Sequence, residues 1–78
     1  LALGKLKVIS ARELLQILNK LGYSIDHQTG SHIILRNSIY PNRRVTVPNH
    51  KEIAKGTLRN IIRECGITIE EFNELLKK

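Results

Sequence analysis

The apolar residues of this 78-residue chain change their spacing twice, and this change limits the folds that the chain can adopt. In residues 11–21, and again from residue 58 onward, they recur every three or four positions, which is the period of a helix that buries one face. In residues 23–47 they form short runs rich in β-branched side chains, separated by Gly, Asn, Ser and Pro. The predicted order is therefore helix, three strands, helix, helix.

The first helix carries signals for both of its ends. Ser10 and Glu13 have the spacing of a capping box, in which each side chain accepts a hydrogen bond from the backbone N–H of the other residue. Gly22 is predicted to end the helix, because glycine adopts the left-handed conformation without a steric penalty. The helical stripe between these ends contains Leu14, Leu18 and Leu21.

The two remaining helices follow the same rules. Thr68 and Glu71 form a second capping-box pattern, which predicts that the last helix begins there. Gly66 is expected to end the middle helix. The buried stripe of the middle helix is predicted to contain Leu58, Ile61, Ile62 and Cys65.

The three predicted strands cover residues 23–28, 32–36 and 44–47. Connections this short cannot make the crossover that parallel neighbours require, so the sheet is predicted to be antiparallel. Helices gathered on one face of such a sheet make an α+β fold. We expect an α-β-β-β-α core with a three-stranded antiparallel sheet, plus a short third helix at the C-terminus.

The register between the first two strands decides which side chains face the helices. A two-residue Thr-Gly loop would place Asp26 in the core, whereas a three-residue loop over residues 29–31 sets Ile25 opposite Leu35. The apolar pattern favours the three-residue loop. It predicts that His27 faces the core.

The same register predicts that His32 points to the open face of the sheet. Other side chains expected on that face are Asp26, Ile34, Arg36, Arg44 and Thr46. An imidazole titrates near pH 6.5 when unperturbed, so at neutral pH it can accept or return a proton. The sequence leaves two interpretations of His32 open: a surface histidine in a strand, or a general base with Arg36 and Arg44 stabilising a developing phosphoryl charge.

A second candidate surface lies at the start of the middle helix. Lys51 and Lys55 precede or open this helix, whose first backbone N–H groups attract anions. Arg59 extends the basic character along its exposed face. Lysines are unfavourable next to the positive end of a helix dipole, which points to an anionic partner. The alternative is that these residues are ordinary solvated charges.

Composition narrows the classes of function. A net charge of +6 favours a polyanionic partner, although a small basic protein can simply be soluble. Three aromatic residues are too few for a base-stacking platform. A single cysteine excludes an internal disulfide, and no metal-site spacing is present, so we expect neither a metal nor another cofactor.

We expect one domain over residues 6–78, with residues 1–5 an expression remnant or a disordered N-terminus. No apolar run approaches the about 20 residues that a membrane-spanning helix needs. The chain is therefore expected to be cytoplasmic and not to associate with a membrane.

Four segments together resemble the HicA family of small ribonuclease toxins, and the resemblance covers nearly all of residues 7–77. They are "SARELLQILNKLGY" from residue 10, "GSH" from residue 30, "VTVPNH" from residue 45 and "AKGTLRNIIRECGIT" from residue 54. The resemblance implies a fold like that of double-stranded-RNA-binding domains. It also implies a toxin of a type II toxin–antitoxin system, which acts as a messenger-RNA interferase and is blocked by a HicB-type antitoxin.

The resemblance implies that His32 is the catalytic histidine, and that Lys51 and Lys55 lie where related domains meet phosphates. A second catalytic group is not defined by the family pattern. Asp26, His50 or an arginine could each assist.

The sequence therefore predicts a metal-independent endoribonuclease that acts on single-stranded or messenger RNA. Cleavage would proceed by attack of a 2′-hydroxyl on the adjacent phosphate. A non-catalytic double-stranded-RNA-binding module that uses the same basic face is the main alternative. A domain that binds only protein is a third.

Overall fold

The structure is a computed structural model that describes residues 6–40 and 42–77. It confirms the predicted α+β order. The elements are α1 (Ala11–Lys20), β1 (Tyr23–Thr29), β2 (His32–Asn37), β3 (Arg44–Pro48), α2 (Lys55–Glu64) and α3 (Ile69–Lys77). The remnant expected at residues 1–5 lies outside the described residues, as does residue 78 at the end of the predicted domain.

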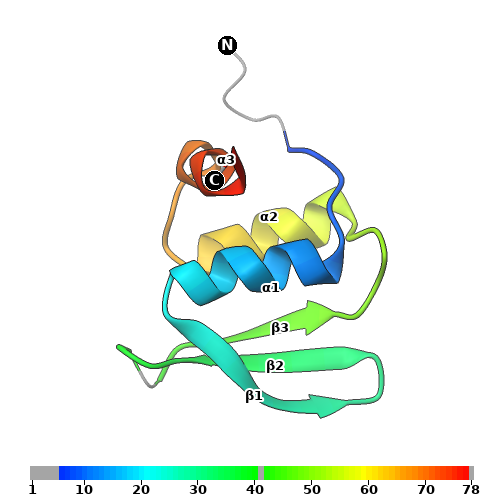
Figure 1. The fold of residues 1–78 in the computed structure, drawn as a ribbon, viewed down its shortest axis with the longest axis vertical. Helices are drawn as coiled ribbons and strands as arrows, with labels where there is room; N and C mark the ends of the chain where they lie inside the picture. Colours follow the sequence, from blue (N-terminus) through cyan, green and yellow to red (C-terminus); the bar gives the residue numbers. More distant parts are fainter. Residues whose placement is uncertain (1–5, 41, 78) are drawn as a thin grey trace.

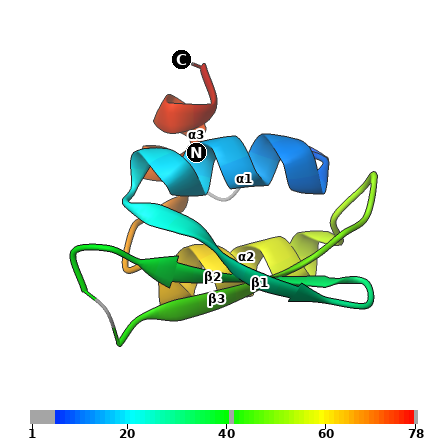
Figure 2. The ribbon, with the colours of Figure 1, turned by 60° about the horizontal axis from the view of Figure 1, so that its bottom comes forward.

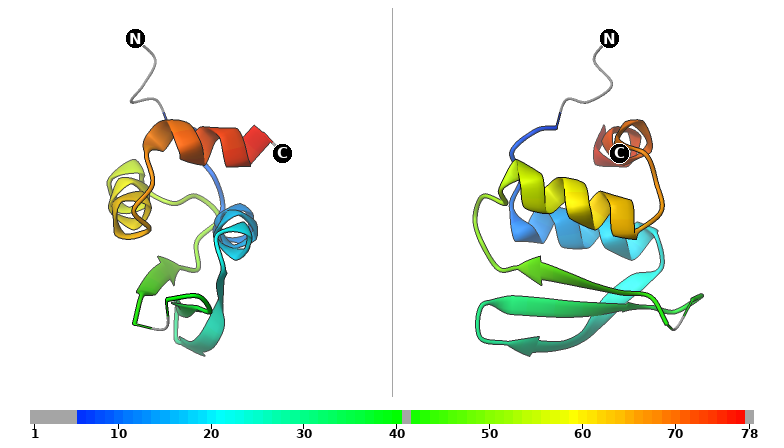
Figure 3. Two further views of the ribbon diagram at one scale, coloured as in Figure 1. Left: turned by 90° about the vertical axis from the view of Figure 1, so that its left-hand side faces the viewer. Right: turned by 180° about the vertical axis from the view of Figure 1, so that it is seen from behind.

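The elements form three layers (Figure 1). The sheet is antiparallel in the order β1-β2-β3. α1 and α2 lie over one face of it, and α3 lies across both helices on the side away from the sheet (Figure 3). No element of residues 6–40 and 42–77 covers the opposite face of the sheet, and Figure 2 brings this open face forward. Both helices that touch the sheet therefore lie on one face, as predicted.

The core lies between the sheet and the first two helices. It combines the inward side chains of β2 and β3 with the apolar stripes of α1 and α2. Its most deeply buried members include Leu14, Leu18, Leu35, Val45, Val47 and Leu58. In the described residues, no helix is both long and apolar enough to cross a membrane.

Both capping boxes form as predicted. The Ser10 Oγ accepts a hydrogen bond from the Glu13 N–H at 3.2 Å, and a Glu13 carboxylate oxygen accepts one from the Ser10 N–H at 2.9 Å. Thr68 and Glu71 make the same two contacts at 3.0 and 2.8 Å. Capping satisfies N–H groups that have no acceptor within the helix.

The connection between β1 and β2 differs from the prediction. Thr29 pairs with His32, so the loop is the two residues Gly30 and Ser31, and Gly30 has a φ of 53°. The predicted pairing of Ile25 with Leu35 is nevertheless correct. Both facts hold because β1 contains a bulge between Ile25 and His27, which adds one residue to that strand.

This bulge overturns the prediction that His27 faces the core. A bulge reverses the alternation of side chains beyond it, so His27 pairs with Ile34 and lies on the open face, exposed to solvent. Tyr23, before the bulge, remains buried. Ile25 was expected in the core but is 56% exposed; β1 is one of the two edge strands of the sheet, and Ile25 lines a groove between this strand and α1.

Candidate active site

The open face of the sheet carries a histidine at one end and two arginines at the other. His32 is exposed at the start of β2, as the alternation of that strand predicts. Ile34 and Thr46 form the next cross-strand pair, and Arg36 and Arg44 form the pair beyond it. Strand pairing thus places positive charge on the same face as the imidazole.

His32 also lines a groove at its end of the sheet. The groove has a volume of about 360 Å³ and continues from the edge of β3 to the start of α2. Its lining residues are His32, Thr46, Pro48, His50, Ala54 and Thr57. Two of the three histidines of the chain therefore face one cavity.

The groove opens onto the first turn of α2. Ala54 is the N-cap of this helix and Thr57 its third residue, and both line the cavity. Among the described residues, none caps this helix through its side chain, and its first turn contains no acidic residue. The N–H groups of a first turn have no acceptor within the helix and carry partial positive charge, so the cavity is suited to an anion.

Three exposed basic residues lie in the loop before α2 and along its first two turns. Lys55 and Arg59 are both exposed and lie four residues apart on α2, so they are neighbours on its surface. Lys51 is exposed in the preceding loop, where Glu52 is the next residue. The predicted RNA-binding residues thus form two groups, one at α2 and one at the arginine pair of the open face.

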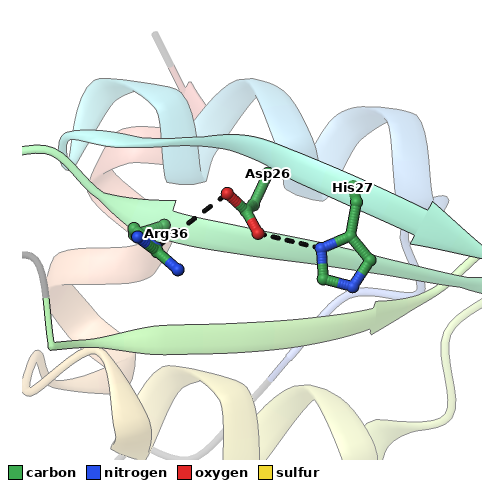
Figure 4. Close-up of polar contacts among 3 residues, drawn as sticks. All are labelled: Asp26, His27 and Arg36. Carbon is green, nitrogen blue, oxygen red and sulfur yellow. Dashed lines mark hydrogen bonds and ion pairs between the residues drawn. The ribbon is translucent and has the colours of Figure 1, made fainter.

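Asp26 lies in the bulge of β1 and contacts two neighbours (Figure 4). One carboxylate oxygen is 2.8 Å from Nδ1 of His27, and the other is 3.9 Å from Nε of Arg36. The hydrogen bond with His27 is the main reason why the pKa of Asp26 lies below its ordinary value, and the charges of Arg36 and Arg44 lower this pKa further, while partial desolvation opposes the shift.

The groups considered as assistants were Asp26, His50 or an arginine. Among the described residues, only His50 of these lines the groove of His32. Asp26 instead joins Arg36 and His27. Sequence reasoning missed His27 as a member of the open face because a bulge has no sequence signal in this segment. It also missed Pro48 and Thr57, which reach the groove through tertiary packing.

The family model described as HicA toxin of bacterial toxin–antitoxin matches residues 11–67. This chain belongs to the HicA toxin family. The match includes the whole sheet, the groove and α2, and it ends before α3. The predicted family is therefore confirmed. A search of curated proteins found no match.

This HicA toxin brings together no group of three or more His, Cys, Asp or Glu side chains that could hold a metal ion, within residues 6–40 and 42–77. The polar character of the groove comes from imidazoles, hydroxyl groups and the N–H groups of a helix start. These groups can exchange protons and bind an anion.

The lowered pKa of Asp26 predicts how an Asp26→Asn variant will behave. A carboxyl group whose pKa is lower in the folded than in the unfolded chain stabilises the fold above its unfolded pKa, near 3.8 here. That contribution is lost as the pH falls through the lower folded value. We expect Asp26→Asn to reduce the melting temperature at pH 7 and to match the parent in strong acid, as measured by circular dichroism.

In high salt, the difference in melting temperature between the parent and Asp26→Asn at pH 7 should become smaller, because salt screens the interaction of partly exposed charges. A difference in melting temperature that stays constant from neutral pH to strong acid would contradict this account.

Proposed function

We propose that this HicA toxin is a metal-independent endoribonuclease that cleaves messenger RNA. The observation that supports this most strongly is that His32 lines a groove which opens onto the start of α2, a helix start that no side chain of the described residues caps. A phosphate bound at the helix start would lie in the same cavity as the imidazole. The groove thus combines a proton acceptor with a site for the scissile phosphate.

In the proposed reaction, His32 acts as the general base. It accepts the proton of a ribose 2′-hydroxyl, whose oxygen attacks the adjacent phosphorus. Negative charge on the phosphoryl oxygens would be stabilised by the N–H groups of the α2 first turn and by Lys55. The products are a 2′,3′-cyclic phosphate and a 5′-hydroxyl end.

Exposed basic residues near the start of α2 and on the open face would hold the RNA backbone. Lys51 lies in the loop before α2, and Lys55 and Arg59 are exposed on that helix. Arg36 and Arg44 would extend the path across the open face. Contacts of this kind recognise phosphates and carry no sequence information. The proposed substrate is therefore single-stranded or messenger RNA held by its backbone.

A non-catalytic module that binds double-stranded RNA is the alternative function. The exposed residues Lys55 and Arg59 at helical spacing favour it, because helix residues of this kind can follow the phosphates of a duplex. This module would bind RNA without cleaving it.

The catalytic role of His32 predicts a selective loss in the His32→Ala variant. We expect its cleavage rate to fall by about 10²–10⁴-fold, the usual contribution of a general base. Its affinity for RNA should change little, because the basic residues remain. Cleavage by the parent should continue in EDTA, and mass spectrometry of the products should find cyclic phosphate ends.

His27→Ala is a matched control, since His27 is also an exposed histidine of the open face. Full activity of His32→Ala with an intact fold would refute the mechanism, as would loss of parental activity in EDTA. Salt-dependent binding with no scission by the parent would favour the binding module.

The basic residues predict a graded effect on affinity. Replacement of Lys51, Lys55, Arg59, Arg36 or Arg44 by alanine should weaken binding of RNA of any sequence. Each loss should reduce the slope of log affinity against log salt by about 0.7, the value for one phosphate of a single strand. Fluorescence anisotropy over a salt series measures this slope.

Lys77→Ala is the control for this series, because Lys77 lies on α3, in the layer farthest from the sheet. A slope that falls equally in Lys77→Ala would mean that binding depends on net charge rather than on these surfaces.

A toxin of this family acts within a toxin–antitoxin system. We propose that its partner is a HicB-type antitoxin that places carboxylates over the groove and over Arg36 and Arg44. Such a surface would imitate RNA and exclude it. We also propose that the toxin acts in the cytoplasm, where messenger RNA is translated.

This contact predicts that Arg44→Glu weakens antitoxin binding. The new carboxylate of residue 44 would face a carboxylate of the antitoxin, and such a like-charge contact costs several kcal/mol of binding free energy. We therefore expect the affinity to fall by at least about tenfold. Isothermal titration calorimetry can compare Arg44→Glu with Lys77→Glu, which should bind as the parent does. An antitoxin that binds without displacing RNA would contradict the proposed overlap.

A further inference from the structure

The cleavage reaction needs a second proton carrier, because the 5′-oxygen that leaves the phosphorus must gain a proton. His32 accounts for one proton transfer in the proposed function. The chain has two more histidines, His27 and His50, and the structure distinguishes clearly between them.

His50 lines the same groove as His32, together with Ala54 and Thr57 at the start of α2. A phosphate bound at that helix start would therefore have an imidazole available from each of two separate segments. His27, by contrast, lies on β1, and its Nδ1 is engaged by the Asp26 carboxylate at 2.8 Å. His27 lies on the open face, where it pairs with Ile34 of β2.

The backbone holds the two groove histidines in a fixed relation. The Asn49 N–H donates a hydrogen bond to the Ser31 C=O at 2.7 Å, which joins the residue before His50 to the residue before His32. His32 itself pairs with Pro48. The segments that carry the two imidazoles are therefore connected directly.

The backbone of His50 is anchored on both sides. Its N–H donates to the Pro48 C=O at 2.9 Å, and its C=O accepts from the N–H of Ala11, the first residue of α1, at 2.9 Å. These contacts involve only main-chain atoms. The fold thus uses the backbone of His50 and leaves its imidazole to line the groove.

We propose that His50 is a second catalytic residue, which donates a proton to the leaving 5′-oxygen while His32 accepts the proton of the 2′-hydroxyl. This inference rests on the proposed ribonuclease function. The bond from the 2′-oxygen to phosphorus forms, and the bond from phosphorus to the 5′-oxygen breaks. His32 gains one proton and His50 loses one, and exchange with water restores both.

The test uses the variants His32→Gln, His50→Gln and His27→Gln with two RNA substrates. Cleavage of a messenger RNA by the parent first identifies a susceptible bond. One substrate then contains this bond in its natural form, and the other has sulfur in place of its 5′-oxygen. A thiol has a pKa of about 8.5, far below that of an alcohol, so its anion leaves without being protonated.

On the natural substrate, His50→Gln should lower kcat by about 10²–10⁴-fold. On the sulfur substrate it should cleave nearly as fast as the parent. His32→Gln should be slow on both substrates, and His27→Gln should resemble the parent on both. Affinity for a 2′-O-methyl RNA, which cannot be cleaved, should be the same for the parent and for His50→Gln.

Parental activity of His50→Gln on the natural substrate would overturn the inference. An equal defect on both substrates would do the same, since it would mean that His50 acts in binding or folding. If the sulfur substrate restored the cleavage rate of His27→Gln or of His32→Gln but not that of His50→Gln, the restored variant would identify the proton donor. All three results leave the ribonuclease activity intact, although rescue of His32→Gln would also reverse the proposed role of His32 as general base. A parent that cleaves no RNA refutes both proposals.

Circular dichroism verifies the fold of each variant. If His50→Gln does not fold, His50→Asn provides a smaller amide for the same comparison, and the main-chain hydrogen bonds of residue 50 can form with either side chain.

Discussion

Strand β2 is hydrogen-bonded on both edges, and this double pairing determines what the open face can present. β1 and β3 fix its register from either side, while α1 and α2 cover the face that holds Ile33 and Leu35. A slip by one residue would bury His32 and Arg36 and expose the two aliphatic residues. The position of the imidazole therefore follows from the burial of its neighbours on the same strand.

The loop between β3 and α2 positions that helix so that a groove forms beside the sheet. Asn49, His50 and Ile53 in this loop are hydrogen-bonded through their main chains to Ser31, Ala11 and Ile9, respectively. These contacts hold the start of α2 next to the end of the open face. The result is a groove lined by two imidazoles and by the first turn of a helix, which carries partial positive charge.

Most of the fold could be predicted from short-range patterns. The capping boxes at Ser10 and Thr68 and the aliphatic stripe of α2 are local features, and the structure contains each of them. The exposure of His32 could also be predicted, because Ile33 and Leu35 must face the helices. The location of His27 could not, since it depends on a bulge that the alternation of side chains in β1 does not reveal.

The sequence by itself determined the order of the elements, the covered face of the sheet and the strand position of His32. Helical and strand periods, caps and apolar alternation depend on neighbours within a few residues, so they can be read directly. Only the tertiary structure decided that His50 shares a groove with His32 while Asp26 joins His27 and Arg36. These associations depend on a bulge and on hydrogen bonds between distant main-chain groups, and neither leaves a periodic signal in the chain.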